Sequence, residues 1–192
     1  MAKLEKSRAL CLLGVVLVGF AFTARAAEPV GDEAKFIKNV EQLSFSSMNL
    51  GKAGEAYFSP DGKKIIFQAT PAGQTEYQIY TMDLADRKPK MVSTGKGACT
   101  CAYFRPDGKK IVFASSHLDP TLGQPKPPKE GRNYAWDFNE HMDIFEADLD
   151  GSNLKRLTDA VGYDAEGSYS SDGKSIVFTS NRDGDLEIYV MD

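Results

Sequence analysis

Residues 104–113 read Phe-Arg-Pro-Asp-Gly-Lys-Lys-Ile-Val-Phe, which is typical of two strands joined by a tight turn. Pro106 fixes φ at the first corner, Asp107 can hydrogen-bond its own backbone, and Gly108 adopts positive φ without steric cost. The β-branched and aromatic residues that follow suit a pleated, half-buried surface. The stretch therefore predicts a β-hairpin.

The same hairpin pattern occurs three times in the chain. It reads Ser-Pro-Asp-Gly-Lys-Lys at 59–64, Arg-Pro-Asp-Gly-Lys-Lys at 105–110 and Ser-Ser-Asp-Gly-Lys-Ser at 170–175. The aspartates of the first two copies are 46 residues apart (107 − 61), and those of the last two are 65 apart (172 − 107). Repeats of about 40–50 residues are typical of propellers and solenoids. The longer second interval predicts an insertion of roughly 20 residues.

Each repeat predicts short antiparallel strands, so the chain is expected to be all-β with about three four-stranded propeller blades. The blades cover about 55–94, 101–158 and 165–192, and the last one lacks a fourth strand. Residues 39–45 resemble the fourth strand of the second repeat and are predicted to be a fourth-type strand, placed before any complete repeat. Because closed propellers have about four to eight blades, the sequence predicts an incomplete or half propeller.

Three explanations of the incomplete propeller remain open. The chain is a piece of a longer protein, or two copies close as a homodimer into a six-bladed ring, or the three sheets form an open solenoid. The two ends are complementary, because one carries an extra fourth-type strand and the other lacks one. Pairing such ends removes exposed sheet edges.

Residues 1–26 predict an export signal rather than part of the fold. Basic residues within 3–8 precede an apolar run at 9–22, and Ala-Arg-Ala at 24–26 provides a cleavage site. The run of about 14 residues is short for a membrane span, which needs roughly 20. We expect cleavage, a leader at 27–38, a periplasmic or secreted location and no stable membrane span afterwards. An uncleaved anchor is the alternative.

Charge and cysteine content restrict the possible partners and cofactors. The formal net charge is −4 and the basic residues are not clustered, so nucleic acid is not expected as a partner.

After the signal, Cys99 and Cys101 are the remaining cysteines, and on a strand they point to the same face. A disulfide between them would have poor geometry, so we expect reduced or partly buried thiols. A strained redox pair or a metal-ligating pair is the alternative.

The insertion at 117–140 supplies the candidate binding residues. Its prolines exclude it from the sheet, and long ordered loops are usually functional. Aromatic residues two apart lie on one face of an extended segment and are frequent in binding hot spots. We predict a lip for a protein or a glycan, and packing of the aromatic residues over their own sheet is the alternative. The candidates are the aromatic residues Tyr134, Trp136 and Phe138 and the flanking histidines His117 and His141.

Motifs for metal binding and catalysis are weak. The two histidines and their neighbouring carboxylates match no metal motif, so solvated or capping histidines are expected. Residues 146–151 begin like an EF-hand loop, but Leu157 occupies the twelfth position in place of the bidentate glutamate. Residues 167–171 do not match the nucleophile elbow of serine hydrolases. We therefore expect no catalytic residue, no cofactor and no metal ion.

The repeats resemble those of TolB-like β-propellers. The resemblance rests on residues 59–67, 78–83 and 164–189, and it covers 40–192. It implies an exported, non-catalytic scaffold that binds a protein partner at the cell envelope. Similar repeats form the gating propeller of prolyl oligopeptidase-like peptidases and the body of oligogalacturonate lyases. The alternative is therefore the propeller portion of such an enzyme, with its catalytic part outside this chain.

Overall fold

The structure, a computed structural model, describes residues 31–124 and 138–192. The chain divides into two units, Met1–Gln42 and Leu43–Asp192. The described residues of the first unit contain the short 3-10 helix η1 (Gly31–Lys35), and the predicted signal peptide lies outside the described residues. Within the described ranges, no helix has the length and apolar character needed to cross a membrane.

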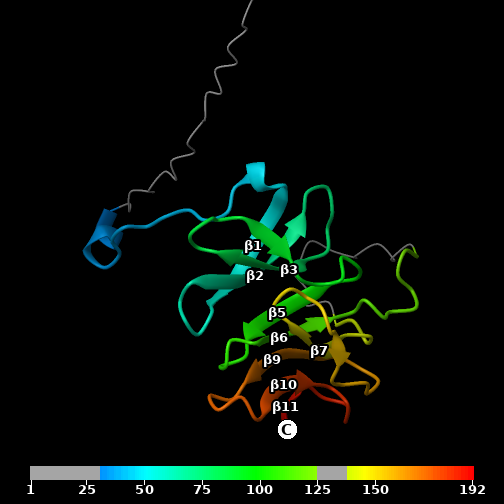
Figure 1. Cartoon of the computed structure of the whole chain (residues 1–192). Coiled ribbons are helices and arrows are strands. Elements are labelled where there is room, and N and C mark those ends of the chain that lie inside the picture. The colour runs from blue at the N-terminus through cyan, green and yellow to red at the C-terminus, as the bar shows by residue number, and fades with distance from the viewer. Residues whose placement is uncertain (1–30, 125–137) are drawn as a thin grey trace, which may run out of the picture. The chain divides into compact units, whose positions relative to one another are not determined.

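The second unit is an all-β structure of three antiparallel sheets that follow one another in chain order (Figure 1). A 3-10 helix, η2 (Ser46–Met48), precedes the first sheet. The first sheet has the order β1 (Leu50–Phe58), β2 (Lys64–Pro71), β3 (Gln78–Asp83) and β4 (Pro89–Met91). The second has the order β5 (Cys99–Phe104), β6 (Lys110–Ser115), β7 (Asp143–Asp148) and β8 (Lys155–Arg156). The third has the order β11 (Glu187–Met191), β10 (Ile176–Ser180) and β9 (Asp164–Tyr169).

The three predicted hairpins are confirmed, and their turns share one geometry. Gly62, Gly108 and Gly173 each have φ of +69°. The N–H of each glycine donates to the carbonyl of the residue three positions earlier, at 2.8–2.9 Å. The carboxylate of the preceding aspartate accepts from the N–H two residues further on, at 3.0–3.2 Å. Positive φ at the fourth turn position explains the glycine in every repeat.

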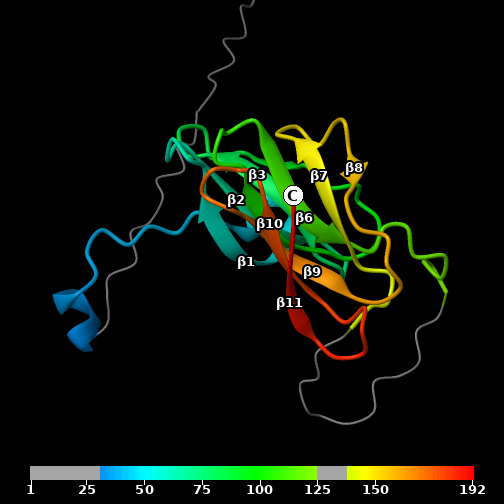
Figure 2. The same ribbon diagram turned by 90° about the horizontal axis from the view of Figure 1, so that it is seen from below.

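Two apolar layers hold the three sheets together. Phe113 of β6 and Phe145 of β7 lie between the first and second sheets with their ring centroids 6.3 Å apart. A second layer lies between the second and third sheets, and Figure 2 views the molecule from the side of the third sheet. The first layer contains the buried residues Ile66, Ile79, Val92, Phe104, Ile111, Phe113 and Phe145. The second contains Val112, Ile144, Tyr163, Ala165, Ile176 and Phe178.

The predicted strand at 39–45 is wrong. Of these residues, Glu41 alone makes a β-bridge. Leu43 and Met48 instead pack against the outer face of the first sheet, where Phe67 and Met82 are buried. Leu43 is thus the residue of this segment that contributes its side chain to the apolar cluster of the first sheet.

Most strand positions follow the prediction, with two differences. β1 begins at Leu50 rather than at residue 55. β4 and β8 are shorter than predicted, with three and two residues. The insertion lies between β6 and β7 as expected, and its central part, 125–137, is outside the described residues. The structure is thus a partial propeller of two four-stranded sheets and one three-stranded sheet.

Candidate functional site

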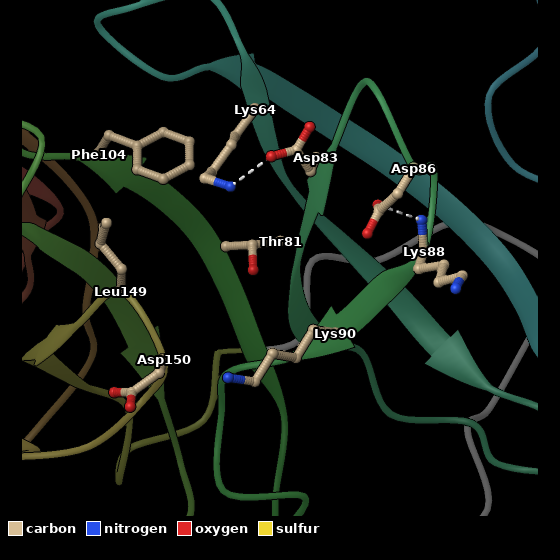
Figure 3. Close-up of a pocket in the computed structure, with 9 residues that line it drawn as sticks. All are labelled: Lys64, Thr81, Asp83, Asp86, Lys88, Lys90, Phe104, Leu149 and Asp150. Carbon is tan, nitrogen blue, oxygen red and sulfur yellow. Dashed lines mark hydrogen bonds and ion pairs between the residues drawn. The ribbon is translucent and has the colours of Figure 1, made fainter.

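An open groove of about 250 Å³ lies between the first and second sheets (Figure 3). Phe104 of β5 and Leu149 of the turn after β7 form its apolar wall. Lys64, Thr81 and Lys90 of the first sheet form the facing wall. The groove continues into a second hollow lined by the first two Pro-Asp-Gly turns. We call these two hollows together the inter-sheet groove.

The charged side chains of the inter-sheet groove are largely paired. Lys64 Nζ lies 2.7 Å from Asp83 Oδ2, and this hydrogen bond holds the pKa of Asp83 below its usual value. The pKa of Asp150 is lowered by the Ser152 hydroxyl and more weakly by Lys90. Both carboxyl groups are therefore ionised at neutral pH and poorly suited to donate a proton. The groove offers an apolar wall with a charged rim, which suits recognition better than proton transfer.

A second feature recurs in the first strand of each sheet. β1, β5 and β9 each contain a register shift against the neighbouring strand. One irregularity of each strand, the second of two in β1, contains a non-glycine residue with positive φ: Glu55 (48°), Cys101 (53°) or Glu166 (58°). Such bulges re-aim a side chain and are frequent next to functional sites. Backbone strain of this kind at a non-glycine residue is also a pointer to function.

The three bulge residues, which we call the bulge cluster, lie near one another across the three sheets. Cys101 Sγ donates to Glu55 Oε2 at 3.5 Å, and Thr179 Oγ1 donates to Glu166 Oε2 at 3.2 Å. Burial raises the pKa of the Cys101 thiol to about 12, and the charges of Glu55 and Glu166 act in the same direction. The cluster thus presents two carboxylates beside a protonated thiol, which suits a partner that donates hydrogen bonds or carries positive charge.

No family model matches the chain. A stretch of 39 residues, 20% of this chain and 9% of the relative, is 49% identical to the Tol-Pal system protein TolB of Bordetella pertussis. TolB from Acinetobacter baumannii is 28% identical with a TM-score of 0.53, and the match covers 73% of this chain and 30% of that structure. A putative TolB from Agrobacterium tumefaciens is 25% identical with a TM-score of 0.54, covering 74% and 47%.

The chain is a TolB-like β-propeller. The predicted resemblance and the predicted fold class are therefore confirmed. The TolB-like chain spans less than a tenth of the curated relative's length and less than half of either solved structure. The similarity therefore does not by itself assign the activity or the partners of the whole relatives to this chain.

Both cysteines of the described TolB-like chain are free. The Cys99 thiol is buried within hydrogen-bond distance of the Ser115 hydroxyl (3.1 Å), and burial raises its pKa. Since thiolates are the reactive species, both thiols are expected to be unreactive in the folded protein.

This unreactivity predicts a large difference between folded and unfolded protein in a thiol assay. With Ellman's reagent at neutral pH, the folded TolB-like chain should react slowly at Cys99 and Cys101, and denaturant should release both thiols rapidly. Peptide mapping assigns the labelled cysteines and separates them from any contribution of Cys11. Fast labelling of folded Cys101 would contradict its protonated, partly buried state.

His117 lies at the base of the insertion and packs onto the second sheet. Its ring centroid is 4.4 Å from that of Phe145, and Nδ1 shares a hydrogen bond of 2.9 Å with the hydroxyl of buried Ser115. Burial lowers the pKa of His117, and the positive charges of Arg156 and Lys96 act in the same direction. His117 is therefore neutral at pH 7, and its role in binding stays a prediction.

Acidification is expected to destabilise the protein through His117. Its pKa is about 6.5 in the unfolded chain and lower in the folded one, so the unfolded chain binds a proton more readily. The contribution of His117 to the free energy of unfolding is complete above about pH 6.5. It falls as the pH drops below that value, and the loss levels off below the pKa of His117 in the folded protein. Urea unfolding at several pH values measures it. His117→Gln should flatten this part of the profile, and an unchanged profile would contradict the assignment.

His141 lies in a more exposed and polar environment. Its Nε2 is 3.8 Å from Asp119 Oδ1 and 3.9 Å from Glu140 Oε1. Asp119 is already engaged by the Thr121 N–H and hydroxyl, each at 2.7 Å. Among the described residues, no three or more His, Cys, Asp or Glu side chains are arranged to hold a metal ion.

Of the three predicted aromatic residues, only Phe138 is among those described. Its side chain is 49% exposed, and its ring contacts that of Tyr163 edge-on with centroids 5.3 Å apart. Phe138 thus packs over the start of the third sheet while half of its surface faces solvent. Tyr134 and Trp136 lie outside the described residues, and the binding role of all three remains a prediction.

Sequence reasoning missed the bulge cluster. Each member stands six positions before the aspartate of its turn: 61 − 55, 107 − 101 and 172 − 166. Aligning the three repeats on these aspartates would have placed Glu55, Cys101 and Glu166 at the same position of the repeat. The bulge itself is not visible in the sequence, because none of the three residues is a glycine or another residue that signals positive φ.

Proposed function

We propose that this TolB-like chain is an exported, non-catalytic scaffold that binds a protein partner at the cell envelope. The observation that supports the proposal is the combined sequence and structural similarity to two TolB structures over 73% and 74% of the chain. The curated relative carries the name of the Tol-Pal system. The signal-like residues 1–26 support export.

Two surfaces are proposed to contact the partner. The first is the insertion lip, with Phe138 as its described aromatic member, together with Tyr134, Trp136, His117 and His141. The second is the bulge cluster, where Glu55 and Glu166 favour a partner group that is cationic or donates hydrogen bonds. Aromatic anchors contribute most of the binding energy in many interfaces, whereas exposed charges mainly steer association. A glycan ligand of the lip is the other possible outcome.

The export part of the proposal is tested by the mass of the protein recovered from cells. Expression of residues 1–192 in a Gram-negative host should give a periplasmic product that begins at Ala27. A product that keeps residues 1–26 and sediments with membranes would instead indicate an uncleaved anchor.

The binding part is tested by site-specific photo-crosslinking in the cell envelope. A photoreactive amino acid replaces Phe138 in one variant, Glu166 in a second and Val161, an exposed loop residue, in a control. Adducts with one envelope protein are expected at 138 or 166 and not at 161. Equal adducts at all three positions, or none at the two candidate positions, would contradict the proposal.

The non-catalytic part has a separate readout. The purified chain should not hydrolyse chromogenic proline-containing peptides and should not cleave oligogalacturonate. Turnover above that of a heat-denatured sample would favour the alternative, in which this chain is the propeller portion of a peptidase or lyase.

A further inference from the structure

The inter-sheet groove has a counterpart between the second and third sheets. Three positions of the two interfaces correspond, either by their distance from the turn aspartate or by their cross-strand partner. In the first and second interface respectively, the corresponding residues are Ser59 and Arg105, Thr81 and Glu146, and Phe104 and Tyr169. The two interfaces therefore show the same place in the fold with different side chains.

Between the second and third sheets, the chain fills this place with its own side chains. The Tyr169 hydroxyl donates to Glu146 Oε1 at 2.7 Å. Arg105 Nη1 lies 3.7 Å from the same oxygen, and the guanidinium carbon lies 5.8 Å from the centroid of the Tyr169 ring. A Cβ on Gly173 would lie 3.4 Å from Arg105 Nε. The guanidinium thus occupies the space between an aromatic ring, a carboxylate and the next turn.

Between the first and second sheets, the same place is open. Ser59 and Thr81 are shorter than their counterparts, and Phe104 has no hydroxyl group. A Cβ on Gly108, the counterpart of Gly173, would meet no heavy atom within 4 Å beyond its chain neighbours. Gly108 itself lines the inter-sheet groove. The groove is therefore the space that an arginine side chain fills in the next interface.

The charges of the inter-sheet groove favour a cation. Carboxylates outnumber lysines along its two hollows, so the lining is negative overall. The Ser59 hydroxyl and the Lys63 N–H donate to Asp61 and hold the pKa of its carboxyl group below the usual value. The charged lining residues are Asp61, Asp83, Asp86, Asp107 and Asp150, and Lys64, Lys88 and Lys90.

We propose that the inter-sheet groove binds an arginine side chain of a partner protein. The guanidinium lies against Phe104, as Arg105 lies over Tyr169 in the next interface, and Asp61 and Asp107 offset its charge. A planar guanidinium suits this place better than an ammonium, because it stacks on aromatic rings and is more weakly hydrated. The lining residues belong neither to the bulge cluster nor to the insertion, so the proposal does not rest on the proposed function.

Nuclear magnetic resonance titration of the purified, ¹⁵N-labelled chain tests the proposal. The probe is the peptide acetyl-Gly-Arg-Gly-amide, and a dissociation constant of roughly 1–10 mM is expected for one side chain. The largest shifts should be those of the Gly62 and Gly108 amides, in the two turns that line the groove. The citrulline peptide, which has nearly the same shape without the charge, should bind about tenfold more weakly, and the lysine peptide should also bind more weakly.

Two matched variants test whether the peptide occupies the groove. Ser59→Arg brings the side chain of Arg105 to the corresponding place and should weaken peptide binding by about tenfold or more. Ser170→Arg makes the same change in the third hairpin, which does not line the groove, and should leave the affinity unchanged. The serines are matched, because each hydroxyl donates to the aspartate two positions later at 2.7 Å.

A second pair of variants tests the charge without adding bulk. Asp107→Asn removes one carboxylate from the groove and should weaken the arginine peptide by about threefold, the scale of an exposed charge pair. Asp172→Asn is the matched change in the third turn and should have no effect, because both carboxylates accept from the N–H two residues further on. Circular dichroism should show that the variants keep the fold. If Ser59→Arg does not, the Asp107 variant carries the test.

Several results would overturn the proposal. The peptide could produce no saturable shifts in the groove, or the citrulline or lysine peptide could bind equally well. The affinity could be unchanged in both Ser59→Arg and Asp107→Asn. Stronger binding of acetyl-Gly-Asp-Gly-amide would assign the groove to an acidic segment. Shifts of the groove amides on dilution of the protein alone would assign the groove to a contact between copies of the chain.

Discussion

Replacement of Phe113 with alanine is expected to lower the free energy of unfolding by about 3–5 kcal/mol. Phe113 is fully buried between the first and second sheets, where it stacks with Phe145. The loss combines the transfer free energy of the ring with the cost of the cavity left between two sheets. Urea denaturation followed by circular dichroism measures the change.

Phe58→Ala is the matched control for this prediction. Phe58 lies at the end of β1 and is one of the large exposed apolar side chains. Its truncation removes little buried area, so a change of at most about 0.5 kcal/mol is expected. Equal effects of the two substitutions would mean that the layer between the first and second sheets does not hold the fold together.

Arg182→Ala is expected to destabilise the protein by roughly 3 kcal/mol, the lower end of the range for breaking a buried ion pair. Arg182 Nη2 lies 3.0 Å from Asp164 Oδ2, and Asp164 is 1% exposed. The guanidinium also lies over the Phe178 and Tyr189 rings, 5.1 and 5.0 Å from their centroids. The variant would leave a buried carboxylate with the Ser180 hydroxyl but without its cation.

A double-mutant cycle separates the lost charge pair from the lost packing. Asp164→Asn in the Arg182→Ala background should restore part of the stability, because no buried charge is then left unpaired. Lys174→Ala removes the cation of the exposed pair with Asp172 and should leave the denaturation midpoint unchanged. Additive effects of the Arg182 and Asp164 substitutions would contradict the coupling.

A stretch that looks functional in the sequence is explained by its hairpin and by the packing of that hairpin on the first sheet. Residues 146–151 begin like a calcium loop, yet Asp148 accepts from the Asn153 amide and Lys110 Nζ, at 2.6 and 2.7 Å, at the end of a hairpin. Gly151 in this hairpin lies so close to Val92, which directly follows β4, that a Cβ would overlap its backbone. The glycine thus serves the contact between sheets, which no local pattern could indicate.

The sequence by itself determined the hairpins and the number of sheets. The Pro-Asp-Gly turn needs positive φ at its glycine, and the turn fixes the register of the two strands that flank it. Both features are therefore local. For the same reason the repeat resemblance was sufficient to predict the TolB-like fold class.

The tertiary structure decided which residues of the repeats meet. Glu55, Cys101 and Glu166 come together because bulges re-aim them across three sheets, and the pairing of β-strands is a long-range property. It also decided that 39–45 is not a strand: Glu41 makes a single β-bridge, and Leu43 packs against the apolar cluster of the first sheet. The same packing leaves Val177, Ile188 and Val190 exposed, although their equivalents in the other two sheets are covered or replaced by polar residues. The burial of a strand residue depends on whether another sheet packs against its own sheet. The same local sequence pattern is therefore buried in one repeat and exposed in another.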